Sequence, residues 1–264
     1  MPEPAIAESV GPGPGGHGRR GANPTSEKWF LIWVGIAIGA VFPTLVTLLY
    51  FVLAAEFTAV VQQSVYGLLK SLQFLFPVVW VSIVLRQRLA LGQPKTGGIL
   101  AGFVFGLMVV AAMTILYYGW YQSTDLFRGV AVAVIAKLTG AGIDSVAKYA
   151  ALALFYSVVH SLLEEYYFRW FVFGQLRQVV PCGLAIILSA VAFTAHHVIV
   201  LAFYFGWGSW ATWFFVFAIT LGGVMWAWLY DQTQSLYAPW CSHFLVDVGI
   251  FWIGYELVRN AFTG

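Results

Sequence analysis

The chain is a succession of long apolar stretches, separated by short segments that carry charges, glycine or proline. A helix needs about 20 mostly apolar residues to cross the hydrocarbon core of a bilayer. Inside that core every backbone donor and acceptor must be satisfied within its own segment, which an α-helix achieves. The pattern therefore predicts an all-α, polytopic transmembrane helix bundle with about seven or eight spans. The expected spans are residues 29–55, 66–85, 98–120, 149–175, 183–204, 209–230 and 238–258.

The same pattern limits the alternatives. Strands of a transmembrane β-barrel alternate apolar and polar positions, whereas residues 41–53 and 211–229 are apolar on all sides, so a barrel is excluded. The stretch 125–148 mixes charges with an apolar run, 130–136, that is too short to cross. We expect this stretch to lie on the membrane surface or to re-enter the membrane.

Composition agrees with a bilayer as the solvent. The chain has 264 residues, of which 61% are hydrophobic and 9% charged, and its mean hydropathy is +0.83. That leaves too little polar surface to cover a water-soluble globule. Residues 1–28 are rich in glycine and proline and lack the apolar stretch of a secretory signal, so we expect a disordered cytosolic tail. Residues 29–264 are expected to form a single transmembrane domain, because no connecting segment is long enough to fold separately.

The placement of lysine and arginine predicts the orientation. If the N-terminus is cytoplasmic, more of the basic residues between spans lie on the cytoplasmic side than outside. The positive-inside rule then predicts a multi-pass protein with a cytoplasmic N-terminus, and we expect its location to be the cell inner membrane. The cytoplasmic set is Arg19, Arg20, Lys28, Arg86, Arg88, Lys95 and Arg177, against Arg128, Lys137, Lys148 and Arg259 outside.

Net charge and cysteine usage exclude other classes. A formal charge of +2 is too small to imply a nucleic-acid partner, and no basic run resembles a binding arm. Cys182 and Cys241 are isolated and fall in or beside apolar segments. They suggest neither a disulfide framework nor a metal knuckle, and we expect two buried thiols.

Charges inside a span are the first candidates for chemistry. Each costs at least about 2.5–3.5 kcal/mol to insert at the centre of a helix, so it is functional by default. The span 149–175 contains His160, Glu164, Glu165 and Arg169. Glu165 and Arg169 share a helical face, as do His160 and Glu164, because each pair is four residues apart. Adjacent Glu164 and Glu165 point about 100° apart, so one can pair with Arg169 while the other faces a cavity.

Two later spans add imidazoles and one carboxylate. Residues 183–204 contain His196 and His197, and residues 238–258 contain His243 and Asp247, one helical turn apart. If these spans pack against the span that carries Glu164, the polar groups converge in one low-dielectric pocket. Each group could instead be a helix-to-helix hydrogen bond. Their concentration in three late spans favours a catalytic or transporting site, with His160 and His196 the weaker candidates.

The motifs of three known classes of intramembrane protease are weak or absent in the sequence. There is no His-Glu-x-x-His pair for a zincin-like site and no Gly-x-Ser-Gly elbow for a serine protease. An aspartyl dyad needs two facing aspartates, yet only Asp247 lies well inside a span, while Asp125, Asp144 and Asp231 are near span ends.

Three motifs instead resemble those of the CAAX prenyl endopeptidases and bacteriocin-processing enzymes, a family often called CPBP or Abi. Glu164-Glu165-x-x-x-Arg169 resembles the paired-glutamate motif of that family. Phe193-x-x-x-His197 resembles its second motif, and the run from His243 to Asp247 resembles its last, where Asn or Asp is usual. The motifs occur in the family's order, each within a predicted span, and the resemblance covers about residues 149–258.

The resemblance implies an intramembrane endopeptidase that cleaves membrane-associated or lipidated proteins or peptides, without a cofactor. Glu164 would be the general base that activates water, and His197 would hold the same water. His243 and Asp247 occupy the positions that stabilise the oxyanion. Because an ionised aspartate cannot donate a hydrogen bond, we expect Asp247 to orient His243 instead. The implied catalytic residues are Glu164, Glu165, Arg169, His197, His243 and Asp247, with Arg169 anchoring Glu165.

Two alternatives stay open at this point. The site could be metal-dependent, with Glu164, His197, His243 and Asp247 as ligands for zinc. The chain could also be a proton-coupled transporter or a scaffold without hydrolytic activity, because glutamate and histidine chains relay protons too. A transporter often has related halves, and the two halves of this sequence show no such symmetry.

Overall fold

The computed structural model describes residues 26–54, 56–89 and 92–262. The first 25 residues of the expected tail 1–28 lie outside this range. Residues 26–28 are not part of a tail, because helix α1 already begins at Ser26. Glu27 lies in the first turn of α1, where its negative charge is favourable next to the positive end of the helix dipole.

All described secondary structure is helical, and it includes seven segments long and apolar enough to cross a membrane. The predicted all-α transmembrane class and the seven spans are therefore confirmed. The spanning segments are Ser26–Leu53, Ala59–Val84, Thr96–Ser123, Val146–Val179, Cys182–Phe205, Trp210–Thr233 and Tyr237–Phe262. Within them the α-helices are α1 (Ser26–Leu48), α2 (Ala59–Val79), α3 (Thr96–Gly119), α5 (Val146–Leu154), α6 (Ser161–Glu165), α7 (Gly174–Val179), α8 (Cys182–Phe205), α9 (Trp210–Thr233) and α10 (Tyr237–Val258).

Several spans contain wider, π-helical turns. The first two spans end in η1 (Leu49–Leu53) and η2 (Trp80–Val84). In the fourth span η5 (Phe155–His160) and η6 (Tyr166–Phe173) lie on either side of α6. Since α6 carries the paired glutamates, these two π-helical turns flank the strongest candidate motif. Turns of this kind occur often at functional sites.

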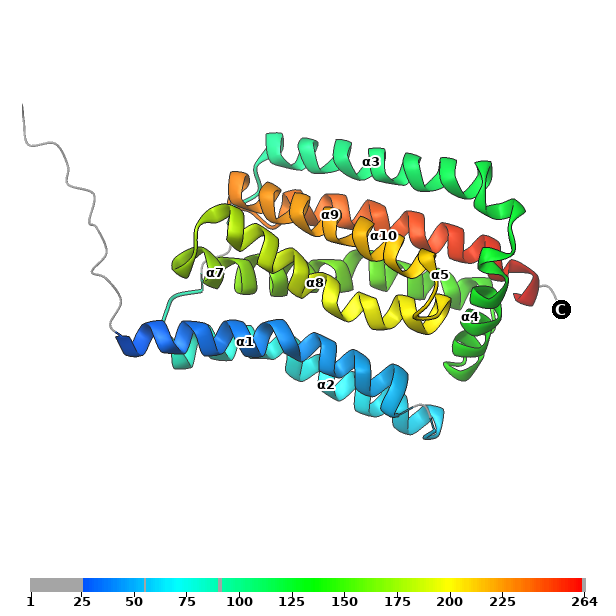
Figure 1. Ribbon diagram of the computed structural model, residues 1–264, viewed down its shortest axis with the longest axis horizontal. Coiled ribbons are helices and arrows are strands. Elements are labelled where there is room, and N and C mark those ends of the chain that lie inside the picture. Colours follow the sequence, from blue (N-terminus) through cyan, green and yellow to red (C-terminus); the bar gives the residue numbers. More distant parts are fainter. Residues whose placement is uncertain (1–25, 55, 90–91, 263–264) are drawn as a thin grey trace, which may run out of the picture.

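The stretch 125–148 contains no candidate span, because its helix has only 13 residues. After the single 3₁₀ turns η3 (Tyr121–Ser123) and η4 (Asp125–Phe127) it forms helix α4 (Arg128–Gly140). A further 3₁₀ turn, η7 (Arg259–Phe262), follows α10. Figure 1 shows α4 at one end of the bundle, steeply inclined to the long helices, where it contacts α8 and α10.

The long helices lie side by side (Figure 1). Helix α3 packs along α10 at one edge and α1 pairs with α2 at the opposite edge, while α8 contacts both α1 and α9. The α3–α10 contact requires glycine, because a Cβ atom added at Gly102 would clash with the backbone carbonyl oxygen of Ala238. Small residues of this kind allow membrane helices to approach closely.

The core of the bundle is aromatic and surrounds the fourth span. Tyr167, Phe168, Phe171 and Phe173 on η6 are all buried, and Phe193 of α8 packs against Phe168. Many outward-facing aliphatic residues of the spans are exposed, as expected for surfaces that face lipid. This packing holds η6, and with it the neighbouring α6, against α8, α9 and α10.

The two cysteines differ in part from the expectation. Both thiols are free, but Cys182 and Cys241 are half-buried rather than buried. Both cysteines lie on helix faces at the edge of the packed core. Cys182 is at the start of α8, and its Sγ atom lies 3.3 Å from Oδ2 of Asp231 on α9. Cys241 lines a surface pocket described below.

Candidate active site

The site is built by three spans that pack against one another. Helix α6 supplies Glu164 and Glu165, and Arg169 follows on η6. Helix α8 supplies His196 and His197, and α10 supplies His243 and Asp247. Contacts between α10 and α6 and between α8 and η6 bring these side chains together in the middle of the bundle.

Glu165 holds two partners at once. Its Oε2 atom lies 3.1 Å from Nε of Arg169, and its Oε1 atom lies 2.8 Å from Nδ1 of His243. Glu165 and Arg169 are both 0% exposed. Because a carboxylate only accepts hydrogen bonds, Nδ1–H of His243 donates to it. Glu165 is therefore occupied on both oxygens, and it fixes the orientation of the His243 ring.

Aromatic rings complete the support of this bridge. The guanidinium carbon of Arg169 lies 4.6 Å from the ring centre of Phe193 and 5.2 Å from that of Trp226 on α9. The Trp226 ring also stacks on His243, with ring centres 4.2 Å apart, and its Nε1 donates to Ser242. Cation–π contacts of this kind contribute most in desolvated surroundings. The orientation of His243 thus rests on α6 and α9 as well as on its own helix.

Glu164 faces a different set of neighbours. One of its oxygens lies 3.4 Å from Nε2 of His196 and 3.9 Å from Nε2 of His160, and the other lies 3.7 Å from Nε2 of His243. Glu164 is 3% exposed. The two adjacent glutamates therefore differ: Glu165 is paired with Arg169 and His243, whereas Glu164 faces three imidazoles.

The remaining predicted residues join the same cluster. Nδ1 of His197 donates to the backbone carbonyl of Phe193, 3.1 Å away, which leaves Nε2 free to accept. The ligand atoms of Glu164, His196 and His197 lie within 4.8 Å of one another. Asp247 lies 3.7 Å from Nε2 of His243, whereas Glu165 makes the shorter contact to Nδ1. Glu165 therefore holds the His243 ring more closely than Asp247 does, and the orienting role expected of Asp247 stays a prediction.

Residues 146–249 match the model of the type II CAAX prenyl endopeptidase family, described as Rce1-like. This part of the chain is similar to that family of membrane endopeptidases. The chain has no match among curated proteins or solved structures. The segment that matches the Rce1-like family begins at α5 and ends within α10, so it contains all six predicted site residues. The family resemblance predicted from the three motifs is confirmed.

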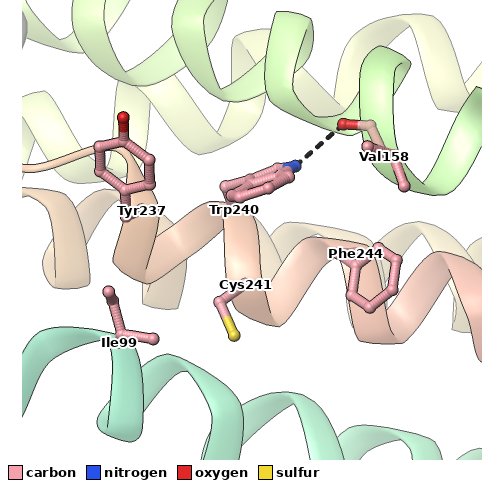
Figure 2. Close-up of a pocket in the computed structure, with 6 residues that line it drawn as sticks. All are labelled: Ile99, Val158, Tyr237, Trp240, Cys241 and Phe244. Atoms are coloured by element: carbon pink, nitrogen blue, oxygen red, sulfur yellow. Dashed lines mark hydrogen bonds between the residues drawn. The ribbon is translucent and has the colours of Figure 1, made fainter. Parts of the chain in front are cut away.

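The Rce1-like segment also borders an apolar pocket that is separate from the polar cluster. Figure 2 shows this pocket between α3, η5 and α10, where the Trp240 indole donates to the backbone carbonyl of Val158 at 3.0 Å. The pocket contains none of the predicted site residues and no acid or imidazole. It is lined by Ile99, Val158, Tyr237, Trp240, Cys241 and Phe244.

Sequence reasoning missed or undervalued two residues near the cluster. His196, a weaker candidate than His197, makes the shortest contact between an imidazole and Glu164. Lys70 on α2 was not considered, although its ammonium group lies against the Phe74 ring, which in turn contacts His160. The signal for Lys70 was present, because it is the one charge in the predicted span 66–85. No sequence signal distinguishes His196 from its neighbour.

Proposed function

We propose that this protein is an intramembrane endopeptidase in which Glu164 is the general base for hydrolysis of a peptide bond. The observation that carries the proposal is that the two adjacent glutamates have different partners. Glu165 is held by Arg169 and His243, while the buried carboxylate of Glu164 faces three imidazoles. A base surrounded by donors in a water-poor site can orient and deprotonate a water molecule. The family assignment supports the same reaction class.

The proposed reaction proceeds in two steps. Glu164 accepts a proton from water as the water oxygen attacks the carbonyl carbon, and the carbonyl oxygen becomes an oxyanion. The oxyanion then collapses, the C–N bond breaks, and the proton on Glu164 passes to the leaving nitrogen. His196 lies closest to Glu164 and orients the water, with His197 beside it on the same helix.

His243 is the proposed donor to the oxyanion. In its protonated form it donates Nδ1–H to Glu165 and keeps Nε2–H for a second acceptor. That Nε2 atom lies 3.7 Å from both Glu164 and Asp247, at the centre of the cluster. Asp247 supports the positive charge of the ring. Removing one donor of this kind costs about 2.7–4 kcal/mol of transition-state stabilisation in other hydrolases.

The proposed substrate is a membrane-associated or lipidated protein or peptide. The chain is an integral, multi-pass membrane protein, and its family acts on CAAX sequences, in which a cysteine near the C-terminus is prenylated. A buried site among spanning helices is reached most readily by a substrate that already lies in the bilayer. The distribution of lysine and arginine favours a cytoplasmic N-terminus, and the proposed location is the cell inner membrane.

The test is a Glu164→Gln variant, purified in detergent and given a fluorogenic peptide that ends in a prenylated C-a-a-X sequence. We expect the turnover number to fall about 10²- to 10⁴-fold, because the amide cannot act as a base. The thermal unfolding midpoint should stay near that of the wild type. The matched control is Glu256→Gln near the end of α10, where the glutamate pairs with exposed Arg259. Unchanged cleavage by Glu164→Gln would reject Glu164 as the base.

A metal-dependent site is the second candidate, and one observation favours it. Glu164, His196 and His197 are a carboxylate and two imidazoles in close proximity, a donor set used by catalytic zinc sites. This set differs from the one expected from sequence, since His243 and Asp247 are not part of the group. Zinc bound there would polarise the carbonyl and activate water. Chelator-treated protein that is free of metal by mass spectrometry, yet fully active, would reject this candidate.

A further inference from the structure

Lys70 is a cation in the middle of an apolar helix. It is the one charged residue between Ala59 and Val84, the limits of the second spanning segment. Within residues 26–54, 56–89 and 92–262, its ammonium group has neither an ion pair nor a hydrogen bond. Its neighbours are aromatic: Nζ lies 5.5 Å from the ring centre of Phe74 and 5.8 Å from that of Tyr66. Intramembrane charges without a partner in the protein indicate a ligand or a transport path.

The position of Lys70 relates it to the candidate active site. Phe74 contacts the ring of His160 edge-on at 6.0 Å, and His160 lies 3.9 Å from Glu164. The contacts through Phe74 and His160 place Nζ within about 17 Å of the Glu164 carboxylate, which an extended peptide covers in about five residues or fewer.

The chemistry of the site decides which anion fits. Glu164, the carboxylate at the end of this series of contacts, already faces three imidazoles. A peptide whose scissile bond lies beside Glu164 brings one negative charge that does not depend on its sequence, the α-carboxylate at its C-terminus. An ammonium group flanked by aromatic rings can bind that carboxylate strongly, because the surroundings exclude water.

We propose that Lys70 binds the C-terminal carboxylate of the substrate and so selects peptides whose chain ends a few residues beyond the scissile bond. The proposal rests on the endopeptidase function assigned above. Lys70 then determines specificity and takes no part in bond cleavage. The anion is supplied by the substrate itself, which explains why no acid of the described chain pairs with this lysine.

The test compares two prenylated peptides that differ only in the C-terminus, one with a free carboxylate and one with a carboxamide. Wild-type protein should prefer the carboxylate about 10- to 100-fold in kcat/KM, the range expected for a hydrogen bond to a charged group. Lys70→Met should reduce this preference below about threefold, through a higher KM for the carboxylate peptide. Its cleavage of the carboxamide should match that of wild type, which shows that the variant is folded. Lys70→Arg should retain the preference.

Lys137 on α4 provides a matched control. Its ammonium group also lies against aromatic rings, 4.6 Å from the centre of Tyr50, but it has no contact with His160 or Phe74. Lys137→Met should keep the wild-type preference. Equal cleavage of both peptides by wild type, or an equal loss of both in Lys70→Met, would overturn the role of Lys70. Failure of wild type to cleave either peptide would instead reject the endopeptidase function.

Discussion

The buried bridge from Arg169 through Glu165 to His243 gives the sharpest prediction about stability. Glu165 and Arg169 are both fully buried, and the Glu165→Gln variant keeps the shape of the side chain while it removes the charge. Leaving the partner of a buried ion pair uncompensated costs about 3–5 kcal/mol. The aromatic contacts of Arg169 to Phe193 and Trp226 persist in the variant, so no further loss is expected. We therefore predict that Glu165→Gln lowers the free energy of unfolding by about 3–5 kcal/mol.

The assay is a double-mutant cycle. Unfolding by denaturant in mixed micelles, followed by circular dichroism, gives the free energy for wild type, Glu165→Gln, Arg169→Met and the double variant. Because the double variant leaves no unpaired charge, it should be more stable than either single variant and within about 1 kcal/mol of wild type. Its peptide cleavage should stay low, since His243 has lost the carboxylate that holds it.

Two outcomes would refute this reasoning. A loss below about 1 kcal/mol in Glu165→Gln would place the pair in a solvated or flexible setting, where ion pairs contribute little. Additive losses in the double variant would show that the two side chains do not interact. Glu256→Gln, which breaks a partly exposed pair with Arg259, should cost less than about 1 kcal/mol and calibrates the measurement.

Two further predictions concern helix packing and the histidine pair. Gly102→Ala should destabilise the protein by about 1–3 kcal/mol through its clash with α10, whereas Gly97→Ala, with open space around it, should be neutral or stabilising. Thermal unfolding should give a lower midpoint for Gly102→Ala than for wild type and an equal or higher midpoint for Gly97→Ala. Similar midpoints for the two variants would contradict the close α3–α10 contact. His196→Ala should lower kcat more than His197→Ala, because Nε2 of His196 makes the shorter contact to Glu164. Equal or reversed losses in steady-state kinetics would count against this geometry.

The spans could be predicted because their signal is local. About 20 apolar residues are needed whichever neighbours a helix has, and the ion pair between Glu165 and Arg169 follows from helical spacing alone. Helix ends were less accurate: α1 begins at Ser26, ahead of the apolar run, and the fourth span extends from Val146 to Val179.

The contacts between helices could not be predicted from spacing. His243 has Asp247 one turn away on α10, yet its Nδ1 pairs with Glu165, because the rotation of α10 turns that nitrogen toward α6. The same limit applies to His196, since adjacent residues point about 100° apart and only the packing of α8 decides which one approaches Glu164. Lys70 could have been predicted as a candidate without knowledge of the packing, because a charged residue within a span is costly and is functional by default.

The most direct test of hydrolysis at this cluster uses a peptide phosphinate, a stable mimic of the tetrahedral intermediate. Its inhibition constant and KM/kcat for the matching peptide would be measured for wild type, His196→Ala and His243→Gln. If these side chains stabilise the transition state, the two quantities rise together, with a slope of about 1 on logarithmic axes. A phosphinate that binds all three proteins equally well, while cleavage falls, would contradict the assignment of the reaction to this cluster.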